Sequence, residues 1–279
     1  MNKDVCIVSP GAYNFAEYLY PVLGCDFSTL NEAPMDASTV ILFGMFLSTG
    51  NVLRPFSRAR RKIGVWIGTD VMQLKHYLKG HQGEHKDFNR LIDVKLADAL
   101  NLAVELEHLG IRMDGVVETP PKVILKPVPL PEVFTVGIYA PPGREAHYFT
   151  ELCLKITKAM PDVQFRLYCR NREFSQVSDN VYDLGAIDVE QEMPDFSALI
   201  RFTEHDGVAI GPVEFMQAGR RVVTNLDIPF AKQCEPNVEQ AVKLLREIQK
   251  EKKPDKKASD YWRGRLNHER YKREMEKYV

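Results

Sequence analysis

The chain has 279 residues, of which 44% are hydrophobic and 27% charged, and its formal net charge is -1. This composition fits a globular protein of about two domains and excludes a disordered chain or a binder of polyanions over its whole surface. No apolar run is long enough to cross a bilayer, and the run at 5–8 is too short for a secretory signal, so we expect a cytoplasmic protein. The five cysteines lack Cys-x-x-Cys spacing and are expected to be reduced and mostly buried.

The first half of the chain alternates short apolar runs with helical patterns. The runs at 5–8, 40–44 and 63–68 are expected to be strands, and residues 91–109 show helical spacing that stops at Gly110. Continuous apolar strands separated by helices indicate a parallel sheet covered on both faces.

Five prolines between 119 and 131 surround another short apolar run, 123–125, which we expect to be a strand. Because proline fixes the backbone and removes a hydrogen-bond donor, this stretch is expected to be a stiff hinge. It divides the chain into an N-terminal domain of residues 1–126, a C-terminal domain of residues 132–258, and a charged terminal helix of residues 259–279 that is expected to pack back on the N-terminal domain.

The second half repeats the alternation. Strands are predicted at 134–139, 163–169, 181–185, 199–203 and 221–224, and helices at 149–160, from about 211, and at 238–249. From Arg246 onward, Lys and Arg exceed Asp and Glu by five, which is typical of a solvated surface helix and also of a site for a polyanion.

Residues 199–224 carry the strongest functional signal, because an apolar strand, a polar turn, a helix that begins with a carboxylate and a second strand follow one another closely. Such a unit presents backbone N–H groups and the positive end of a helix dipole to an anion at the carboxyl ends of parallel strands. Its carboxylates can also hold sugar hydroxyls. Phosphate and sugar together indicate a nucleotide ligand.

Each polar residue of this window has two interpretations. Glu214, expected in the first turn of its helix, either accepts hydrogen bonds from both ribose hydroxyls or is a favourable charge at a helix start. Asp206, which precedes Gly207, either touches the transferred sugar or is a turn or cap residue. Arg201 either binds phosphate or pairs with a carboxylate, and His205 either orients a ligand or is merely exposed.

Two polar residues of the N-terminal domain are expected near the ligand. Thr69 and Asp70 follow a strand, and the carboxyl ends of strands in open parallel sheets face the crevice. Asp70 is the best candidate for holding the acceptor hydroxyl, with a helix-cap role as the alternative. In the loop 9–14, Gly11 permits close approach of the backbone to a ligand.

Two successive βα domains, joined by a proline-rich hinge and closed by a terminal helix, resemble the GT-B fold of glycosyltransferases. The window with Ile200-Arg201, His205-Asp206-Gly207 and residues 214–219 resembles the carboxyl-domain signature of the family-four retaining glycosyltransferases, in which an acid and a later glutamate flank the donor. Here that pair is Asp206 and Glu214. Residues 137–144 and 159–165 are similar to the first donor-domain strand, loop and helix of that family, and residues 66–71 resemble the strand end that faces the acceptor.

The resemblance implies an α/β protein with two doubly wound, Rossmann-like parallel-sheet domains facing a central cleft. It implies an enzyme that transfers a hexosyl or pentosyl group from a nucleotide sugar to a hydroxyl acceptor with retention of configuration, the departing phosphate itself taking the acceptor's proton. The implied catalytic residues are Asp206 and Asp70. The implied donor-binding residues are Arg144, Arg201, His205, Gly207 and Glu214, and the implied acceptor-binding residues are Gly11, Thr69 and Asp70.

The sequence departs from the family at two positions. Asp206 stands where a glutamate is common, and no lysine occurs within the five residues after Arg144, where the family commonly has one. No Asp-x-Asp pair occurs, which disfavours a metal clamp, so we expect a metal-independent reaction without a cofactor. Phosphate neutralisation would then depend on Arg144 and the helix start near Gly211.

The acceptor and one alternative stay open. The same fold can hold a nucleotide sugar without turning it over, whereas a dinucleotide enzyme is disfavoured because no Gly-x-Gly-x-x-Gly follows a strand. No obligate protein partner is evident. A basic segment in the N-terminal domain is either a solvated helix face or a site for a polyanionic acceptor, such as DNA with hydroxylated bases or an anionic lipid, beside a plain saccharide. This segment contains Arg54, Arg58, Arg60, Arg61 and Lys62.

Overall fold

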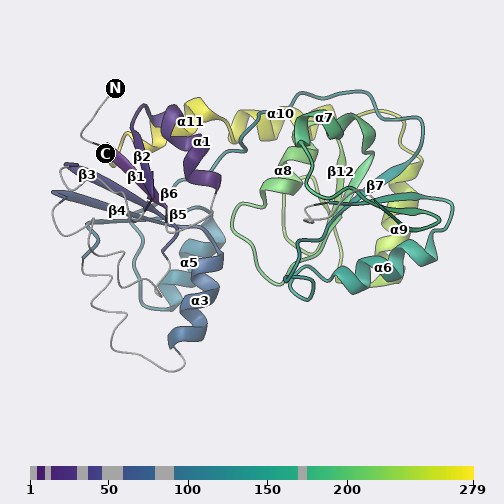
Figure 1. Ribbon diagram of the computed structural model, residues 1–279, viewed down its shortest axis with the longest axis horizontal. Coiled ribbons are helices and arrows are strands. Elements are labelled where there is room, and N and C mark those ends of the chain that lie inside the picture. Colours follow the sequence, from purple (N-terminus) through teal and green to yellow (C-terminus); the bar gives the residue numbers. More distant parts are fainter. Residues whose placement is uncertain (1–4, 10–13, 30–36, 46–58, 79–90, 169–174) are drawn as a thin grey trace. The chain divides into compact units, whose positions relative to one another are not determined.

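A computed structural model describes residues 5–9, 14–29, 37–45, 59–78, 91–168 and 175–279. It divides the chain into two compact units. The first contains residues 1–122, 206–208 and 266–279, and the second contains residues 123–205 and 209–265. Each unit is an α/β domain built on a parallel sheet with helices on both faces, as the sequence predicts (Figure 1).

The first unit holds a parallel sheet with the strand order β2-β1-β3-β4-β5-β6. Its strands are β1 (Val5–Ser9), β2 (Asp26–Thr29), β3 (Thr39–Phe43), β4 (Arg61–Trp66), β5 (Val94–Ala97) and β6 (Gly115–Val116). Its helices are α1 (Asn14–Leu23), α3 (Thr69–Leu78), α5 (Leu100–His108) and α11 (His268–Met275).

Side-chain alternation along the strands explains how this sheet is covered. Ile7 packs in a cluster with Leu19 of α1 and Met275 of α11, whereas its neighbour Val8 packs in a cluster with Leu74 of α3. Successive residues of a strand point to opposite faces, so an apolar run such as 5–8 is stable only when helices cover both. Figure 1 shows α1 and α11 on one face and α3 and α5 on the other.

The second unit holds a sheet with the order β13-β12-β11-β7-β8-β10-β9, in which β9 is antiparallel to β10 and the other pairs are parallel. Its strands are β7 (Thr135–Tyr139), β8 (Gln164–Tyr168), β9 (Ser175–Ser178), β10 (Val181–Asp183), β11 (Ala198–Arg201), β12 (Arg221–Thr224) and β13 (Lys232–Gln233). Its helices are α6 (Thr150–Ala159), α7 (Val189–Glu192), α8 (Ile210–Gln217), α9 (Val238–Gln249) and α10 (Lys256–Arg265), with a 3-10 turn at Met193–Asp195.

Helices cover both faces of this sheet as well. Ile156 of α6 and Leu245 of α9 join one buried cluster with Ile138 of β7. On the other face Gly137 of β7 lies against aromatic rings, since a Cβ there would be 3.1 Å from Phe215 of α8. The absence of a side chain at Gly137 therefore lets α8 approach the central strand closely.

The structure corrects three expectations about secondary structure. Within residues 91–109, β5 precedes α5, because the short run Val94–Ala97 pairs with β4 and β6 instead of extending the helix. The run 123–125 forms no strand, and the Leu125 N–H donates to Gln217 Oε1 at 3.3 Å. The expected single helix of residues 259–279 is two helices, α10 in the second unit and α11 in the first.

Two expectations from composition concern the state of the cysteines and the length of apolar segments. Cys6, Cys25 and Cys153 are buried free thiols and Cys234 is a half-buried one, and Cys169 lies outside the described residues. Burial raises the pKa of the Cys6 thiol to about 11. Within the described part of the chain, no helix combines the length and apolarity that a bilayer crossing needs.

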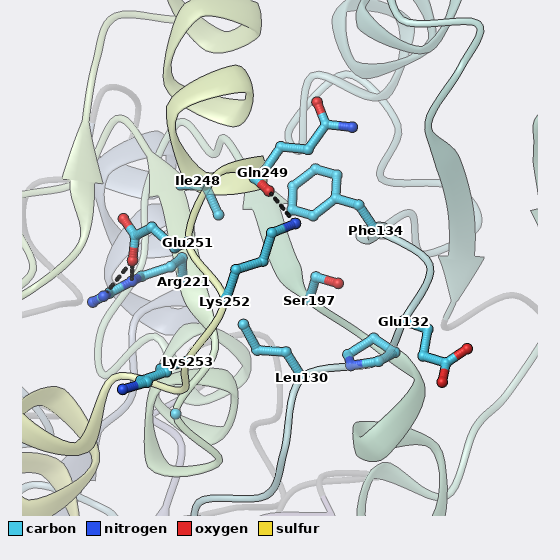
Figure 2. A pocket seen from close by; sticks show the side chains of 12 residues that line it. Leu130, Glu132, Phe134, Ser197, Arg221, Ile248, Gln249, Glu251, Lys252 and Lys253 are labelled. Carbon is cyan, nitrogen blue, oxygen red and sulfur yellow. Dashed lines mark hydrogen bonds and ion pairs between the residues drawn. The ribbon is translucent and has the colours of Figure 1, made fainter.

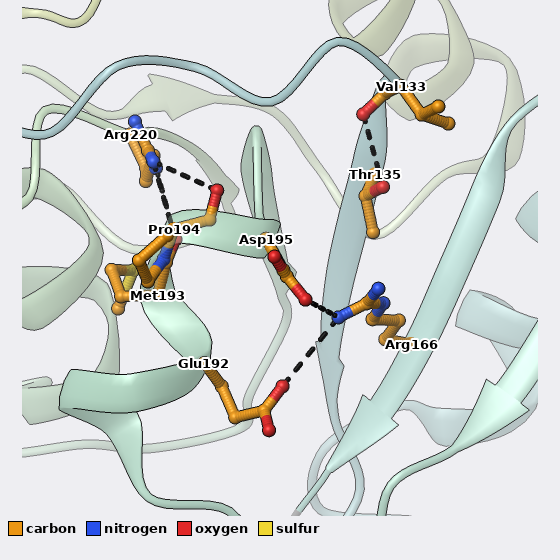
Figure 3. Close-up of polar contacts among 8 residues, drawn as sticks. All are labelled: Val133, Thr135, Arg166, Glu192, Met193, Pro194, Asp195 and Arg220. Atoms are coloured by element: carbon orange, nitrogen blue, oxygen red, sulfur yellow. Dashed lines mark hydrogen bonds and ion pairs between the residues drawn. The ribbon is translucent and has the colours of Figure 1, made fainter.

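Arg220 ties the proline-rich segment to the second unit. Its side chain is fully buried and donates to the carbonyl oxygens of Val128 and Pro129, both at 2.8 Å. It also donates to the carbonyl oxygens of Met193 and Pro194, both at 3.4 Å (Figure 3). One guanidinium thus satisfies carbonyls of two segments that carry few N–H donors because of their prolines.

Replacing Arg220 by methionine is expected to destabilise the second unit by about 2–3 kcal/mol, because buried carbonyls lose their donor. Arg166→Met is the matched control, since Arg166 forms partly exposed ion pairs with Glu192 and Asp195 (Figure 3) and lies over the ring of Phe196. Arg166→Met is expected to lower the free energy of unfolding by about 1 kcal/mol or less. Urea unfolding measures both, and equal costs for the two variants would contradict the assigned role of Arg220.

Candidate functional site

The strand order of the second unit reverses between β7 and β11. From β7 the chain runs to β8 and β10 on one side, and β11 and β12 then continue on the other side. At such a reversal the loops after the two central strands diverge and leave a crevice at the carboxyl edge of the sheet, where open α/β sheets bind their ligands. The loops concerned are residues 140–149 after β7 and residues 202–209 after β11.

Arginine and tyrosine side chains alternate at this edge. The Arg201 guanidinium, at the end of β11, lies 5.0 Å from the ring centroid of Tyr139 and 5.2 Å from that of Tyr148. Arg144 lies 5.2 Å from the centroid of the same Tyr148 ring, and the two tyrosine rings pack edge to face at 4.8 Å. Because guanidinium groups stack on aromatic rings, Tyr148 holds two positive charges, one from the end of β11 and one from the loop after β7.

The same Arg201 lies against the start of α8. A Cβ at Gly211 would be 3.2 Å from Arg201 Nη1, so glycine is what lets the arginine approach the helix. Ala209, the N-cap residue of α8, makes no side-chain cap. The first N–H groups of α8 thus have no capping side chain, and together with Arg201 they form a positive environment suited to phosphate oxygens.

Glu214 lies one turn further along α8 than the sequence suggests. The helix begins at Ile210 and has no acidic residue in its first turn, so the expected place of Glu214 in that turn is wrong. Burial raises the pKa of the Glu214 carboxyl to about 8, although the charge of Arg201 acts in the opposite direction. A carboxyl group whose pKa is raised by burial despite the charge of a nearby guanidinium is unusual and typical of a binding or reaction site.

His147, which was not among the residues expected from the sequence, connects the two loops. His147 is 9% exposed, its Nε2 lies 3.0 Å from Thr203 Oγ1, and its Nδ1 lies 3.6 Å from Glu204 Oε2. His205, which the sequence did indicate, is half-buried, and its N–H contacts Thr203 Oγ1 at 3.4 Å. The signal available for His147 was its place three residues after Arg144 in a loop that follows a strand.

Asp70 lies in the first unit, at the start of α3, next to Thr69. Its carboxylate is fully buried and accepts hydrogen bonds from the backbone N–H groups of Met45 at 2.7 Å, Gly68 at 2.9 Å and Val71 at 2.9 Å. The Ile67 N–H also donates to it, at 3.1 Å. These contacts favour the structural alternative, in which Asp70 holds the turn between β4 and α3, and its role toward an acceptor stays a prediction.

Asp70→Asn is expected to destabilise the first unit by about 2 kcal/mol, because an amide NH₂ would face backbone N–H groups that need an acceptor. Asp93→Asn is the matched control, since Asp93 accepts from the Lys62 N–H at an exposed site. Surface changes of this kind cost roughly 0.5 kcal/mol or less. Thermal unfolding of both variants tests the difference, and an unchanged Asp70→Asn protein would mean that the turn does not depend on the carboxylate.

Asp206 and Gly207 group with the first unit. The Asp206 carbonyl oxygen accepts from Asn101 Nδ2 at 2.8 Å. A Cβ at Gly207 would lie 2.9 Å from Leu102 Cδ1 and 3.1 Å from the Ile67 carbonyl oxygen, so this position requires glycine. The role of Gly207 in donor binding and the catalytic role of Asp206 stay predictions.

The remaining expected residues belong to loops and to the basic segment. Gly11, Arg54 and Arg58 lie outside the described residues. Arg60 and Arg61 are exposed, and Lys62 pairs with Asp93 at 3.7 Å. Arg61 begins β4, so the described part of the basic segment lies at the amino edge of the first sheet, whereas Thr69 and Asp70 follow its carboxyl edge.

A pocket of the second unit, drawn in Figure 2, lies at the amino edge of its sheet, whereas Arg201 ends β11 at the carboxyl edge. It is lined by Ser197, which precedes β11, and by Arg221, which begins β12. Two of its cations are engaged within the pocket, since Arg221 pairs with Glu251 and Lys252 Nζ donates to the Gln249 carbonyl oxygen. We therefore assign the candidate site to the carboxyl edge, where the charged groups converge.

No family profile matches the chain, and no curated protein matches it. Solved structures do resemble it. The sucrose-phosphate synthase of Thermosynechococcus elongatus matches with a TM-score of 0.68 at 10% identity, covering 98% of this chain and 97% of that one. The lipopolysaccharide outer core galactosyltransferase WaaB matches with a TM-score of 0.65 at 13% identity, covering 98% of both.

Other solved structures extend the comparison. The UDP-GlcNAc 2-epimerase of Neisseria meningitidis, bound to UDP-GlcNAc, matches with a TM-score of 0.54 at 10% identity, covering 98% of this chain and 99% of that one. The chain spans 58% of the length of TarM and 59% of a chain of the GtfA/B complex.

These comparisons define the fold. Two Rossmann-like parallel-sheet domains in succession, matched over nearly the whole chain by WaaB and sucrose-phosphate synthase, are the GT-B fold of glycosyltransferases. At identities of 10% and 13% the likeness concerns the fold and not the residues of the site.

Proposed function

We propose that the chain is a glycosyltransferase that takes a nucleotide sugar as donor and transfers its sugar to a hydroxyl group. The observation that carries this proposal is the convergence of Arg144, Arg201, the start of α8 and Glu214 at the strand reversal of the second unit. Breaking a bond between sugar and phosphate places negative charge on the leaving oxygens, and fixed positive groups stabilise it best. The UDP-sugar bound to the epimerase of the same fold is a further reason to look among nucleotide sugars.

The proposed roles follow from position and chemistry. Arg201 and Arg144 bind the diphosphate with the N–H groups of α8, so no metal ion is required. Glu214 accepts hydrogen bonds from the ribose hydroxyls, which a carboxylate can do with two oxygens. Asp206 contacts the transferred sugar, and the departing phosphate takes the proton of the acceptor, so that the configuration of the sugar is retained.

Three measurements test this function. A nucleotide sugar that binds the folded chain raises its melting temperature, by mass action. Slow hydrolysis of that donor without acceptor separates a transferase from a protein that only binds, and a rate unchanged by EDTA indicates that no metal ion is needed. Release of an epimer of the donor sugar would indicate an epimerase instead. If no nucleotide sugar shifts the melting temperature at millimolar concentration, the proposal is wrong.

The acceptor belongs to one of three classes in this proposal: DNA with hydroxylated bases, an anionic lipid, or a plain saccharide. The cations Arg60 and Arg61 are exposed, but they lie at the amino edge of the first sheet. Salt-sensitive retention on duplex DNA that the double change Arg60→Ala and Arg61→Ala removes would select the first class. Retention that is the same with and without these arginines would exclude a role for this segment.

A further inference from the structure

The loop that follows β11 is held from the side of β12 by its backbone. Thr203 is fully buried, its N–H donates to Asn225 Oδ1 at 3.0 Å, and its carbonyl oxygen accepts from Asn225 Nδ2 at 2.8 Å. Asn225 directly follows β12. The amide group of one side chain therefore acts as a further strand residue and extends the pairing of β11 with β12 into the loop.

From the side of β7 the same loop is held by His147. The Glu204 N–H donates to the His147 carbonyl oxygen at 3.1 Å, the imidazole Nε2 lies 3.0 Å from Thr203 Oγ1, and Nδ1 lies 3.6 Å from Glu204 Oε2. The ring also packs edge to face against Tyr148, with centroids 4.7 Å apart. One residue thus connects the loop that carries Arg144 and Tyr148 with the loop that carries His205.

The hydrogen bond between His147 Nε2 and Thr203 Oγ1 has a defined donor, because the Thr203 hydroxyl group has only one proton. Thr203 Oγ1 donates that proton to the His205 carbonyl oxygen at 3.0 Å. In that arrangement His147 Nε2 carries the proton and donates it to Thr203 Oγ1. The Thr203 hydroxyl group thus links the two loops, because it accepts from His147 of one loop and donates to the His205 carbonyl oxygen of the other.

We propose that His147 is a positioning residue of the donor site. It acts through Thr203 and Glu204, fixing the loop after β11 relative to the loop after β7, so that the groups facing the donor keep their spacing. This inference rests on the proposed function, because it concerns the same crevice at the strand reversal. It adds a residue that touches neither the donor nor the acceptor and that acts through Thr203.

Two matched pairs of variants test it. Thr203→Val removes the hydroxyl group while its backbone can still pair with Asn225, and Thr203→Ser restores the hydroxyl group. Thr157→Val removes another buried hydroxyl of the same unit, which donates to the Leu154 carbonyl oxygen in α6. Each variant is measured for donor hydrolysis, as kcat and KM, and for melting temperature. His147→Ala, alone and combined with Thr203→Val, completes a double-mutant cycle.

We expect Thr203→Val and His147→Ala each to lower kcat/KM about 10- to 100-fold, mostly through kcat, since small misplacements of binding groups have effects of this size. Thr203→Ser should recover most of the activity. Thr157→Val should lower the melting temperature as much as Thr203→Val without changing kcat/KM. The double variant should be no worse than His147→Ala, because residues acting through one contact are not additive.

Losses that add in the double variant, or a Thr203→Val protein as active as the wild type, would overturn the proposal. Amide hydrogen exchange of Glu204 and His205 decides the case independently of turnover, because the proposal requires faster exchange at both in Thr203→Val and His147→Ala. If the wild type binds no nucleotide sugar, the proposed function fails, and unchanged exchange would show separately that His147 does not hold the loop.

Discussion

Arg201→Met is expected to lower kcat/KM for donor hydrolysis about 100- to 1000-fold, because the loss of one preorganised donor to a developing anion has effects of this size. Arg201 is 7% exposed, and its guanidinium lies against the rings of Tyr139 and Tyr148. A methionine fills a similar volume against the rings without a charge, so the fold should persist. Nucleoside diphosphate affinity, measured by calorimetry, should fall in parallel.

Two further variants sharpen this test. Arg201→Lys keeps a positive charge but lacks the planar fork that stacks on tyrosine and binds two oxygens at once, so it should recover only part of the activity. Arg246→Met is the matched control, since Arg246 pairs with Asp162 at the surface of the same unit. Normal nucleotide affinity in Arg201→Met would place the diphosphate elsewhere.

The two-domain fold was predictable because apolar runs buried on both faces leave a clear pattern. The predicted strand 221–224 and the predicted helix 238–249 are confirmed as β12 and α9. The prediction of one helix over 91–109 was wrong because a run such as Val94–Ala97 fits a strand as well as a helix. Only pairing with neighbouring strands, which comes from elsewhere in the chain, decides between the two.

The site was predictable in part. Arg144, Arg201 and Glu214 follow from strand ends and from the family resemblance, and they lie in one unit. Tyr139 and Tyr148 were missed because both rings lie against Arg201, which is distant from them in sequence. For Asp70 the sequence left a ligand-binding role and a structural role open, because it does not reveal that four backbone N–H groups donate to the carboxylate.

Glu214 couples the site to pH. Its pKa is about 8 in the folded chain against an ordinary value of 4.5, because burial disfavours the charged form. Between these two values the unfolded chain has lost the proton and the folded chain keeps it, so this group makes stability fall as pH rises. Glu214→Gln cannot ionise, and its stability relative to the wild type should therefore increase with pH across that window and stay constant above it.

Donor affinity should increase with pH over the range in which Glu214 ionises, whereas stability decreases. In the wild type the carboxylate form accepts from the ribose hydroxyls, so nucleoside diphosphate affinity should rise from pH 6.5 to 8.5 as the proton leaves, by up to about tenfold per pH unit. Glu214→Gln should bind about 100-fold more weakly at pH 8.5 and show no such rise. Glu239→Gln, at an exposed position of α9, is the matched control and should follow the wild type. A wild-type affinity that is flat over this range, together with full binding by Glu214→Gln, would mean that the ribose does not contact this carboxyl group.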